Sequence, residues 1–165
     1  MARISIKVAL NIDELVYDFE NKAFLTGRSR KDVMSVENIA SVQASDSEED
    51  RNQALRSIQN AYASLLSALS EYISVDATTG SDVDNTLLGD DEELSYALSM
   101  PANWNQAGKN ALATVSHQYI VNRALADWFI ITNKVDAQEY MTFAGANLDE
   151  IRNILSRRVR PTYGS

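Results

Sequence analysis

Residues 119–130 constrain the fold most tightly, because they are apolar on almost every face that a helix would present. A helix at a protein surface carries one apolar stripe, whereas a helix that is apolar all round normally lies at the centre of a fold. Apolar residues at helical spacing extend this segment back to Asn103, a candidate N-cap, and Asn133 is its expected end. The sequence therefore predicts a buried central helix with other helices around it.

A second helix is expected directly after the central one. Asp136, with Glu139 three residues later, forms a variant of the capping box that marks a helix start. Since only three residues separate the two predicted helices, we expect them to form an antiparallel hairpin.

Two helices are predicted upstream. Asn11 is a candidate N-cap, and apolar residues at helical spacing up to Gly27 predict a helix over 12–26. An apolar stripe with alternating spacings of three and four predicts a long helix over 47–74. This stripe fits packing within the chain better than a coiled coil with a second copy, because three heptads are marginal for a coiled coil.

Two short segments, 4–10 and 94–100, alternate apolar and polar residues with the period of two that is typical of strands. They could pair into a small sheet, which would need helix cover or a neighbour's strand to be stable in water. The predicted fold is mainly α, a bundle of about four helices with a small two-stranded β element. We expect one domain over 1–165, with flexible segments at 28–46 and 75–92.

Composition excludes several classes of protein. The chain has no cysteine, which excludes disulfides, thiolate zinc sites and a cysteine nucleophile. Its net charge of −8 disfavours non-specific binding to nucleic acid or to an anionic membrane. No apolar run approaches the roughly 20 residues that span a bilayer, and the first residues lack the apolar core of a signal peptide.

Few residues suggest catalysis or metal binding. His117 is the only histidine, and its neighbour Ser116 would point about 100° away on a helix, so we interpret His117 as a packing or surface residue. Residues 82–93 resemble a calcium-binding loop in length and acidity, but Leu87 stands where the loop needs glycine. We therefore predict no catalytic, cofactor-binding or metal-binding residues and no cofactor.

Asp127 stands out because it lies inside the apolar helix, one turn after Arg123. A buried carboxylate can act as a general acid. The favoured interpretation is a structural ion pair between Arg123 and Asp127, or between Asp127 and Arg152 or Arg157 of the last helix.

Basic residues gather in two places, at Arg28 and Arg30 and at Arg157, Arg158 and Arg160. Such clusters usually mark solvated faces or helix ends. A second hypothesis is that these five arginines contact a neighbouring subunit or a protein partner.

Several stretches together resemble one family. They are "NIDELVYDFENKAFLTGRSR" (11–30) and the region 94–161, with its "ADWF", its "EY" and its terminal "RRVRP". The chain resembles small virion-assembly proteins of tailed phages and prophages of gut Bacteroidetes-type bacteria, of the head–tail adaptor or neck type. That resemblance implies a structural protein, not an enzyme, that assembles as a ring with portal, tail or neck proteins in the virion or the host cytoplasm.

The sequence is also compatible with two alternatives. One is a small stand-alone helical module that regulates or binds a single partner. The other is a helical-bundle enzyme or ligand binder, which would need a cavity where Arg123, His117 and Asp127 converge.

Overall fold

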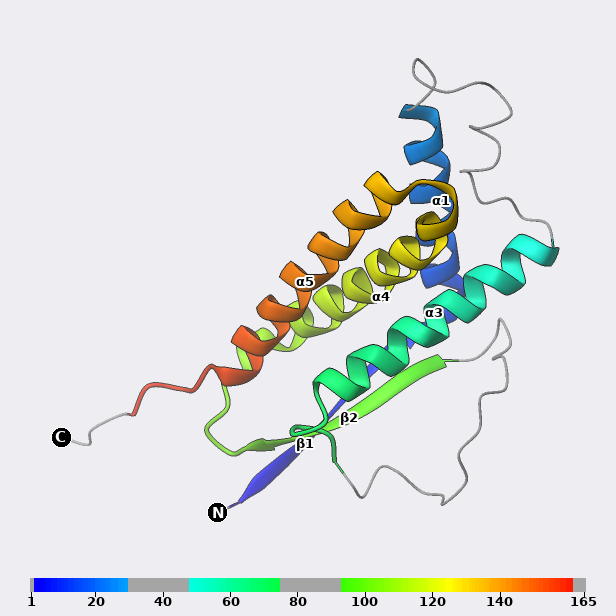
Figure 1. Ribbon diagram of the computed structural model, residues 1–165. Coiled ribbons are helices and arrows are strands. Elements are labelled where there is room, and N and C mark those ends of the chain that lie inside the picture. The colour runs from blue at the N-terminus through cyan, green and yellow to red at the C-terminus, as the bar shows by residue number, and fades with distance from the viewer. Residues whose placement is uncertain (1, 30–47, 75–92, 162–165) are drawn as a thin grey trace.

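The computed structural model describes residues 2–29, 48–74 and 93–161, and Figure 1 shows their arrangement. In chain order these residues form strand β1 (Arg3–Asn11), helix α1 (Ile12–Ser29), helix α3 (Glu48–Ala68), strand β2 (Glu93–Pro101), a short 3-10 helix (Gln106–Gly108), helix α4 (Lys109–Thr132) and helix α5 (Lys134–Ser156). The predicted fold, mainly α with four helices and a two-stranded antiparallel sheet, is confirmed. The segments predicted to be flexible lie outside the described residues, except for 28 and 29, which continue α1.

The two predicted strands pair with each other in antiparallel register, with Ile4 opposite Met100 and Leu10 opposite Leu94. The period of two places the apolar side chains of both strands on one face, where they join the core. Asn11 ends β1 and caps α1, because its Oδ1 accepts hydrogen bonds from the backbone N–H groups of Asp13 (2.8 Å) and Glu14 (3.4 Å). The strand and the helix are thus joined without a loop.

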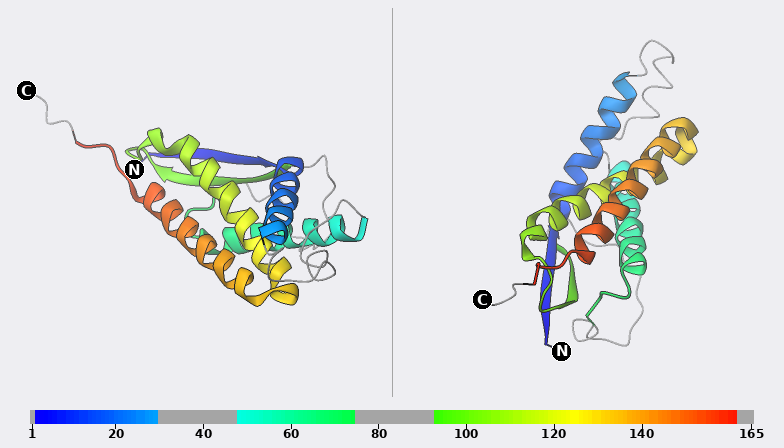
Figure 2. Two further views of the ribbon diagram at one scale, coloured as in Figure 1. Left: turned by 90° about the horizontal axis from the view of Figure 1, so that it is seen from above. Right: turned by 90° about the vertical axis from the view of Figure 1, so that its left-hand side faces the viewer.

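Helix α4 is the central helix, as predicted, and contacts α1, α3, α5 and β1. Leu112, Ile120, Leu125 and Phe129 on α4 are fully buried. The last turn of α4 departs from the prediction, because Ile130 and Ile131 are exposed. Figure 2 shows α5 folding back along α4, which confirms the predicted hairpin.

Helix α4 starts at Lys109 and not near Asn103. The residue responsible is Trp104, whose apolar ring matches the helical spacing but whose indole N–H needs an acceptor. That N–H donates to the backbone carbonyl of Ile154 (3.0 Å), and Trp104 forms an isolated β-bridge with Arg158. Asn105 then caps the 3-10 helix by accepting from the N–H of Ala107 (3.1 Å). Residues 103–108 are therefore a packed connection and not the first turns of α4.

Helix α5 starts two residues earlier than predicted, at Lys134, and Asn133 is its N-cap. Asn133 Oδ1 accepts from the N–H groups of Val135 (3.2 Å) and Asp136 (3.4 Å), and its amide donates to Asp136 Oδ2 (2.6 Å). Asp136 thus occupies the position that closes a capping box, three residues after the cap. Only Asn133 separates the two helices of the hairpin.

The other two helices also differ from prediction at their ends. Helix α1 continues through Gly27 to Ser29, where Thr26 Oγ1 hydrogen bonds to Tyr140 Oη of α5 (2.8 Å). Helix α3 ends at Ala68, and residues 72–74 instead lie against the outer edge of β2. There Ser99 N–H donates to the Tyr72 carbonyl (2.8 Å) and Ser74 N–H donates to the Ala97 carbonyl (2.9 Å). Continuing the helix would have left these edge groups of β2 without partners.

Candidate functional site

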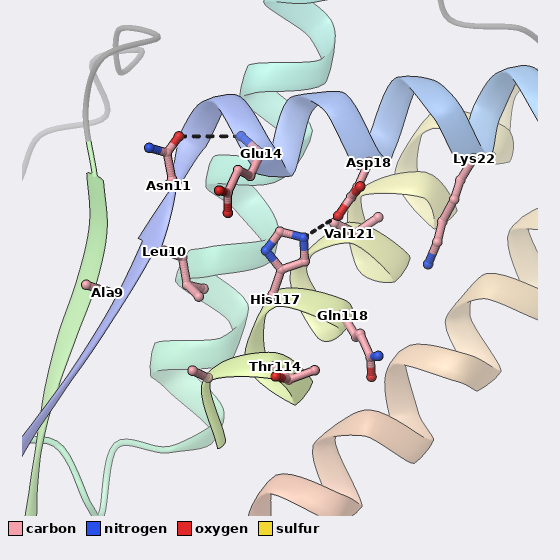
Figure 3. A pocket seen from close by; sticks show the side chains of 11 residues that line it. Ala9, Leu10, Asn11, Glu14, Asp18, Lys22, Thr114, His117, Gln118 and Val121 are labelled. Carbon is pink, nitrogen blue, oxygen red and sulfur yellow. Dashed lines mark hydrogen bonds and ion pairs between the residues drawn. The ribbon is translucent and has the colours of Figure 1, made fainter. Parts of the chain in front are cut away.

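A cleft of about 550 Å³ lies between α1 and α4, at the end of β1 (Figure 3). One wall comes from Asn11, Glu14, Asp18 and Lys22 of the β1–α1 segment. The opposite wall comes from Thr114, His117, Gln118 and Val121 of α4, and Ala9 and Leu10 of β1 close one end.

Sequence spacing explains why these side chains share one wall. Glu14, Asp18 and Lys22 are each four positions apart, so they lie on one face of α1. On α4, Thr114, His117, Gln118 and Val121 are separated by three, one and three positions, and they occupy the face turned toward α1. One face of α1 and one face of α4 therefore build the cleft.

The central contact of the cleft joins the two helices. His117 Nε2 lies 2.6 Å from Asp18 Oδ2, with side chains that are 21% and 44% exposed. At the far end, Lys22 Nζ donates to Asn122 Oδ1 (3.4 Å). Figure 3 shows the Glu14 carboxylate between α1 and β1, and no described residue forms a hydrogen bond or ion pair with it.

His117 was expected to be a packing or surface residue. It is half-buried at the surface, and its pairing with Asp18 was not predicted. The two residues are 99 positions apart, and only the relative rotation of α1 and α4 brings them together. The repeat of polar residues every four positions on α1 was the available signal, and it was compatible with an ordinary solvated face.

Ser116 faces away from the cleft, as the helical geometry predicted. Its hydroxyl is buried and lies 2.5 Å from the hydroxyl of Tyr96 on β2. Within the described ranges, no hydroxyl group hydrogen bonds to His117. The cleft therefore presents carboxylates and a histidine without an assembled nucleophile, and its chemistry suits binding of a cationic group.

The predicted ion pair between Arg123 and Asp127 is present, with 3.5 Å between Nη1 and Oδ1. It lies at the surface and not in the core, because the two side chains are 28% and 33% exposed. Partial burial raises the pKa of Asp127, and the neighbouring Arg123 guanidinium lowers it by less. The alternative partners Arg152 and Arg157 lie toward the other end of α5, which the antiparallel hairpin carries away from Asp127.

Arg123, His117 and Asp127, which the enzyme hypothesis requires to meet in one cavity, do not converge. His117 lines the cleft between α1 and α4, whereas Arg123 and Asp127 line a separate hollow between α4 and α5 with Met141. Among the residues that the structure describes, no group of three or more His, Asp or Glu side chains could hold a metal ion. Residues 82–93, which resemble a calcium-binding loop, lie outside the described residues, apart from Glu93.

The predicted interaction arginines fall into different environments. Arg157 and Arg160 are exposed after the end of α5. The Arg158 guanidinium donates to the carbonyls of Leu155 (2.8 Å) and Arg157 (3.0 Å), so it caps the helix end. Arg28 lies in the last turn of α1, and Arg30 lies outside the described residues.

Comparisons with protein-family models, with curated proteins and with solved structures find no match to this chain. None of the helices in the described ranges has the length and apolar character needed to cross a membrane.

Proposed function

We propose that the chain is a structural component of a phage-like particle, of the head–tail connector (adaptor or neck) class, and that it acts through protein–protein contacts. The observation that carries the proposal is a set of large apolar side chains exposed around the turn of the α4–α5 hairpin. We call this set the hairpin-end surface, and its members are Leu25, Ile130, Ile131, Val135, Met141 and Phe143.

The hairpin-end surface is more apolar than a solvated helix end requires. Ile131 is 86% exposed and Val135 is 62% exposed, and both lie within two residues of the Asn133 turn. Leu25 and Phe143 line one hollow of about 430 Å³, while Ile130 and Met141 line another of about 500 Å³. Exposed apolar patches with hollows are found at contacts with proteins, membranes or ligands, and the proposal assigns this one to a protein contact.

A second exposed feature lies at the other end of α5. The extended residues 157–161, which we call the basic arm, begin after the 23 residues of α5, or about 34 Å from the hairpin turn. A stand-alone module that binds one partner needs a single surface. Two separated surfaces of different chemistry suit a subunit that lies between neighbours, such as portal, tail or neck proteins and further copies of itself.

The test uses purified phage-like particles produced by the genome in which the chain is encoded. We expect mass spectrometry to detect the chain in those particles, and labelled antibody to mark the junction of head and tail. Absence of the chain from purified particles would overturn the proposal. Recovery from the cell extract with one partner would instead favour the stand-alone module.

Matched variants connect the test to the hairpin-end surface. Replacing Ile131 and Val135 by serine should reduce incorporation into particles without unfolding the chain, because both side chains are exposed. Tyr17→Ser is the control, since Tyr17 is 68% exposed on α1 but does not belong to that surface.

A further inference from the structure

We infer that the basic arm of one copy docks in the cleft between α1 and α4 of a second copy, so that copies join head to tail. This inference rests on the proposed function, because it specifies how subunits of a ring would contact one another. Its four supports are the shape of the arm, the charge of the cleft, the open edge of β1 and the distance between arm and cleft.

The arm is held at its base and exposes two arginines. Arg157 has an extended backbone (φ −71°, ψ 138°), and its carbonyl accepts from the N–H of Asn105 (3.2 Å). The N–H of Val159 donates to the Asn103 carbonyl (2.8 Å). The guanidinium groups of Arg157 and Arg160 are exposed, and no described residue pairs with either. The arm is therefore an extended cationic segment that is already ordered at its base.

The cleft offers acceptors for such a segment. The Glu14 carboxylate has no partner in the described part of the chain, and the Asp18 carboxylate remains 44% exposed beside His117. The ammonium group of Lys22 lies at the far end of the cleft, next to Asn122 (Figure 3). An arginine that enters beside Glu14 would meet carboxylate oxygens, with which guanidinium groups form paired hydrogen bonds.

The backbone of β1 gives an extended segment a place to pair. The Ala102 N–H donates to the Ala2 carbonyl (3.2 Å), so even-numbered residues of β1 direct their backbone groups toward β2. The N–H and C=O groups of Ser5, Lys7 and Ala9 consequently point away from β2, toward the outer edge of the sheet. Ala9 also lines the cleft, so strand addition at this edge would lead the segment toward Glu14.

The distance between the basic arm and Glu14 within one copy is too long for them to meet, so their contact must join two copies. The arm bonds to the connection that follows Pro101, which lies opposite Arg3, whereas Glu14 lies just beyond Asn11, which is opposite Glu93. The eight steps along β1 from Arg3 to Asn11 separate these ends by about 27 Å. Arg160 follows directly after the last tethered residue and cannot span that distance, so it can reach only the Glu14 of another copy. Repetition of this heterologous contact gives a ring, or a filament if it does not close.

Reversing the charges of Glu14 and Arg160, singly and together, tests the inference. Light scattering coupled to size-exclusion chromatography, over a range of concentrations, should show self-association of the wild-type chain. Glu14→Arg and Arg160→Glu should each raise the dissociation constant about tenfold or more, because each places like charges together. The double variant Glu14→Arg/Arg160→Glu should restore association, whereas Glu71→Arg, at an exposed acid outside the cleft, should change nothing.

Several results would overturn the inference. One is a wild-type chain that stays monomeric at every concentration. Another is self-association that neither single charge reversal weakens. A third is a double variant that folds but does not regain self-association. Circular dichroism checks folding, and Arg160→Glu alone remains informative if the change at Glu14 disturbs α1. If the chain occurs in particles but charge reversal has no effect, the docking contact is wrong while the proposed function stands. If association depends on both charges but particles lack the chain, the proposed function is wrong.

Discussion

The buried hydroxyl pair between Tyr96 and Ser116 leads to a quantitative prediction about stability. The two oxygens are 2.5 Å apart, and the residues are 5% and 0% exposed, so water cannot replace either partner. Removing one hydroxyl leaves the other buried without its partner, which costs about 1–3 kcal/mol. We therefore expect Tyr96→Phe and Ser116→Ala each to lower the free energy of unfolding by that amount at neutral pH.

The double variant separates pairing from packing. When both hydroxyls are absent, no polar group is left unpaired, and the loss should be smaller than the sum of the single losses by about 1 kcal/mol or more. Urea denaturation of the four proteins measures this coupling energy, provided that the slopes of the transitions agree. Additive losses would show that the two hydroxyls do not depend on each other and would refute the reasoning.

Alkaline pH gives an independent check on the same pair. Burial raises the pKa of Tyr96 to about 12, and the hydrogen bond to Ser116 opposes that rise. The folded chain then holds the phenol proton between pH 10 and 12, whereas the unfolded chain loses it, so stability falls as pH rises through this window. The loss amounts to about 2.7 kcal/mol. Tyr96→Phe should lack this part of the alkaline decline, and equal declines in both proteins would contradict the assigned burial.

Further predictions concern four single sites, all measured by urea denaturation. Gly108→Ala should destabilise the fold by about 1–3 kcal/mol, because the new Cβ would lie 2.9 Å from Ile154 Cγ2. Gly145→Ala should stabilise the fold by about 0.5–1 kcal/mol, because nothing lies within 4 Å of the new Cβ. Trp104→Phe should cost about 1–3 kcal/mol through the lost indole bond to Ile154. Asp127→Asn should change stability by less than about 1 kcal/mol at pH 7. Because burial raises the pKa of Asp127, the wild type should gain stability relative to this variant as pH falls.

Local signals in the sequence predicted much of the fold. The alternation of β1 and β2 identified both strands and their pairing, and Asn11 was identified as the cap that its two hydrogen bonds confirm. Trp104 was misread because apolar spacing does not reveal that an indole N–H will bond to a carbonyl 50 positions away. The end of α3 was misplaced because the unpaired edge of β2 determines where residues 72–74 lie.

The candidate site was harder to predict than the fold. Glu14 and Asp18 could be placed on one helical face, but their position opposite His117 depends on how α1 and α4 rotate and cross. The separation of His117 from the Arg123–Asp127 pair depends on the same packing. Sequence spacing shows which residues share a face of one helix. It does not show how two helices pack, and a cleft between two helices depends on that packing.

The pairing of β1 with β2 also governs the order in which a newly made chain can fold. Arg3 and Ser99, which hydrogen bond across this sheet, are 96 positions apart. At about 5–20 residues per second, a ribosome needs roughly 5 to 20 seconds to add the second strand after the first. During that interval β1 has neither edge covered, whereas α4 and α5 are adjacent in the chain and can pack as soon as both have emerged. The first strand made therefore stays without its partner strand throughout this interval, and a cell that makes this protein must keep that strand from pairing elsewhere in the meantime.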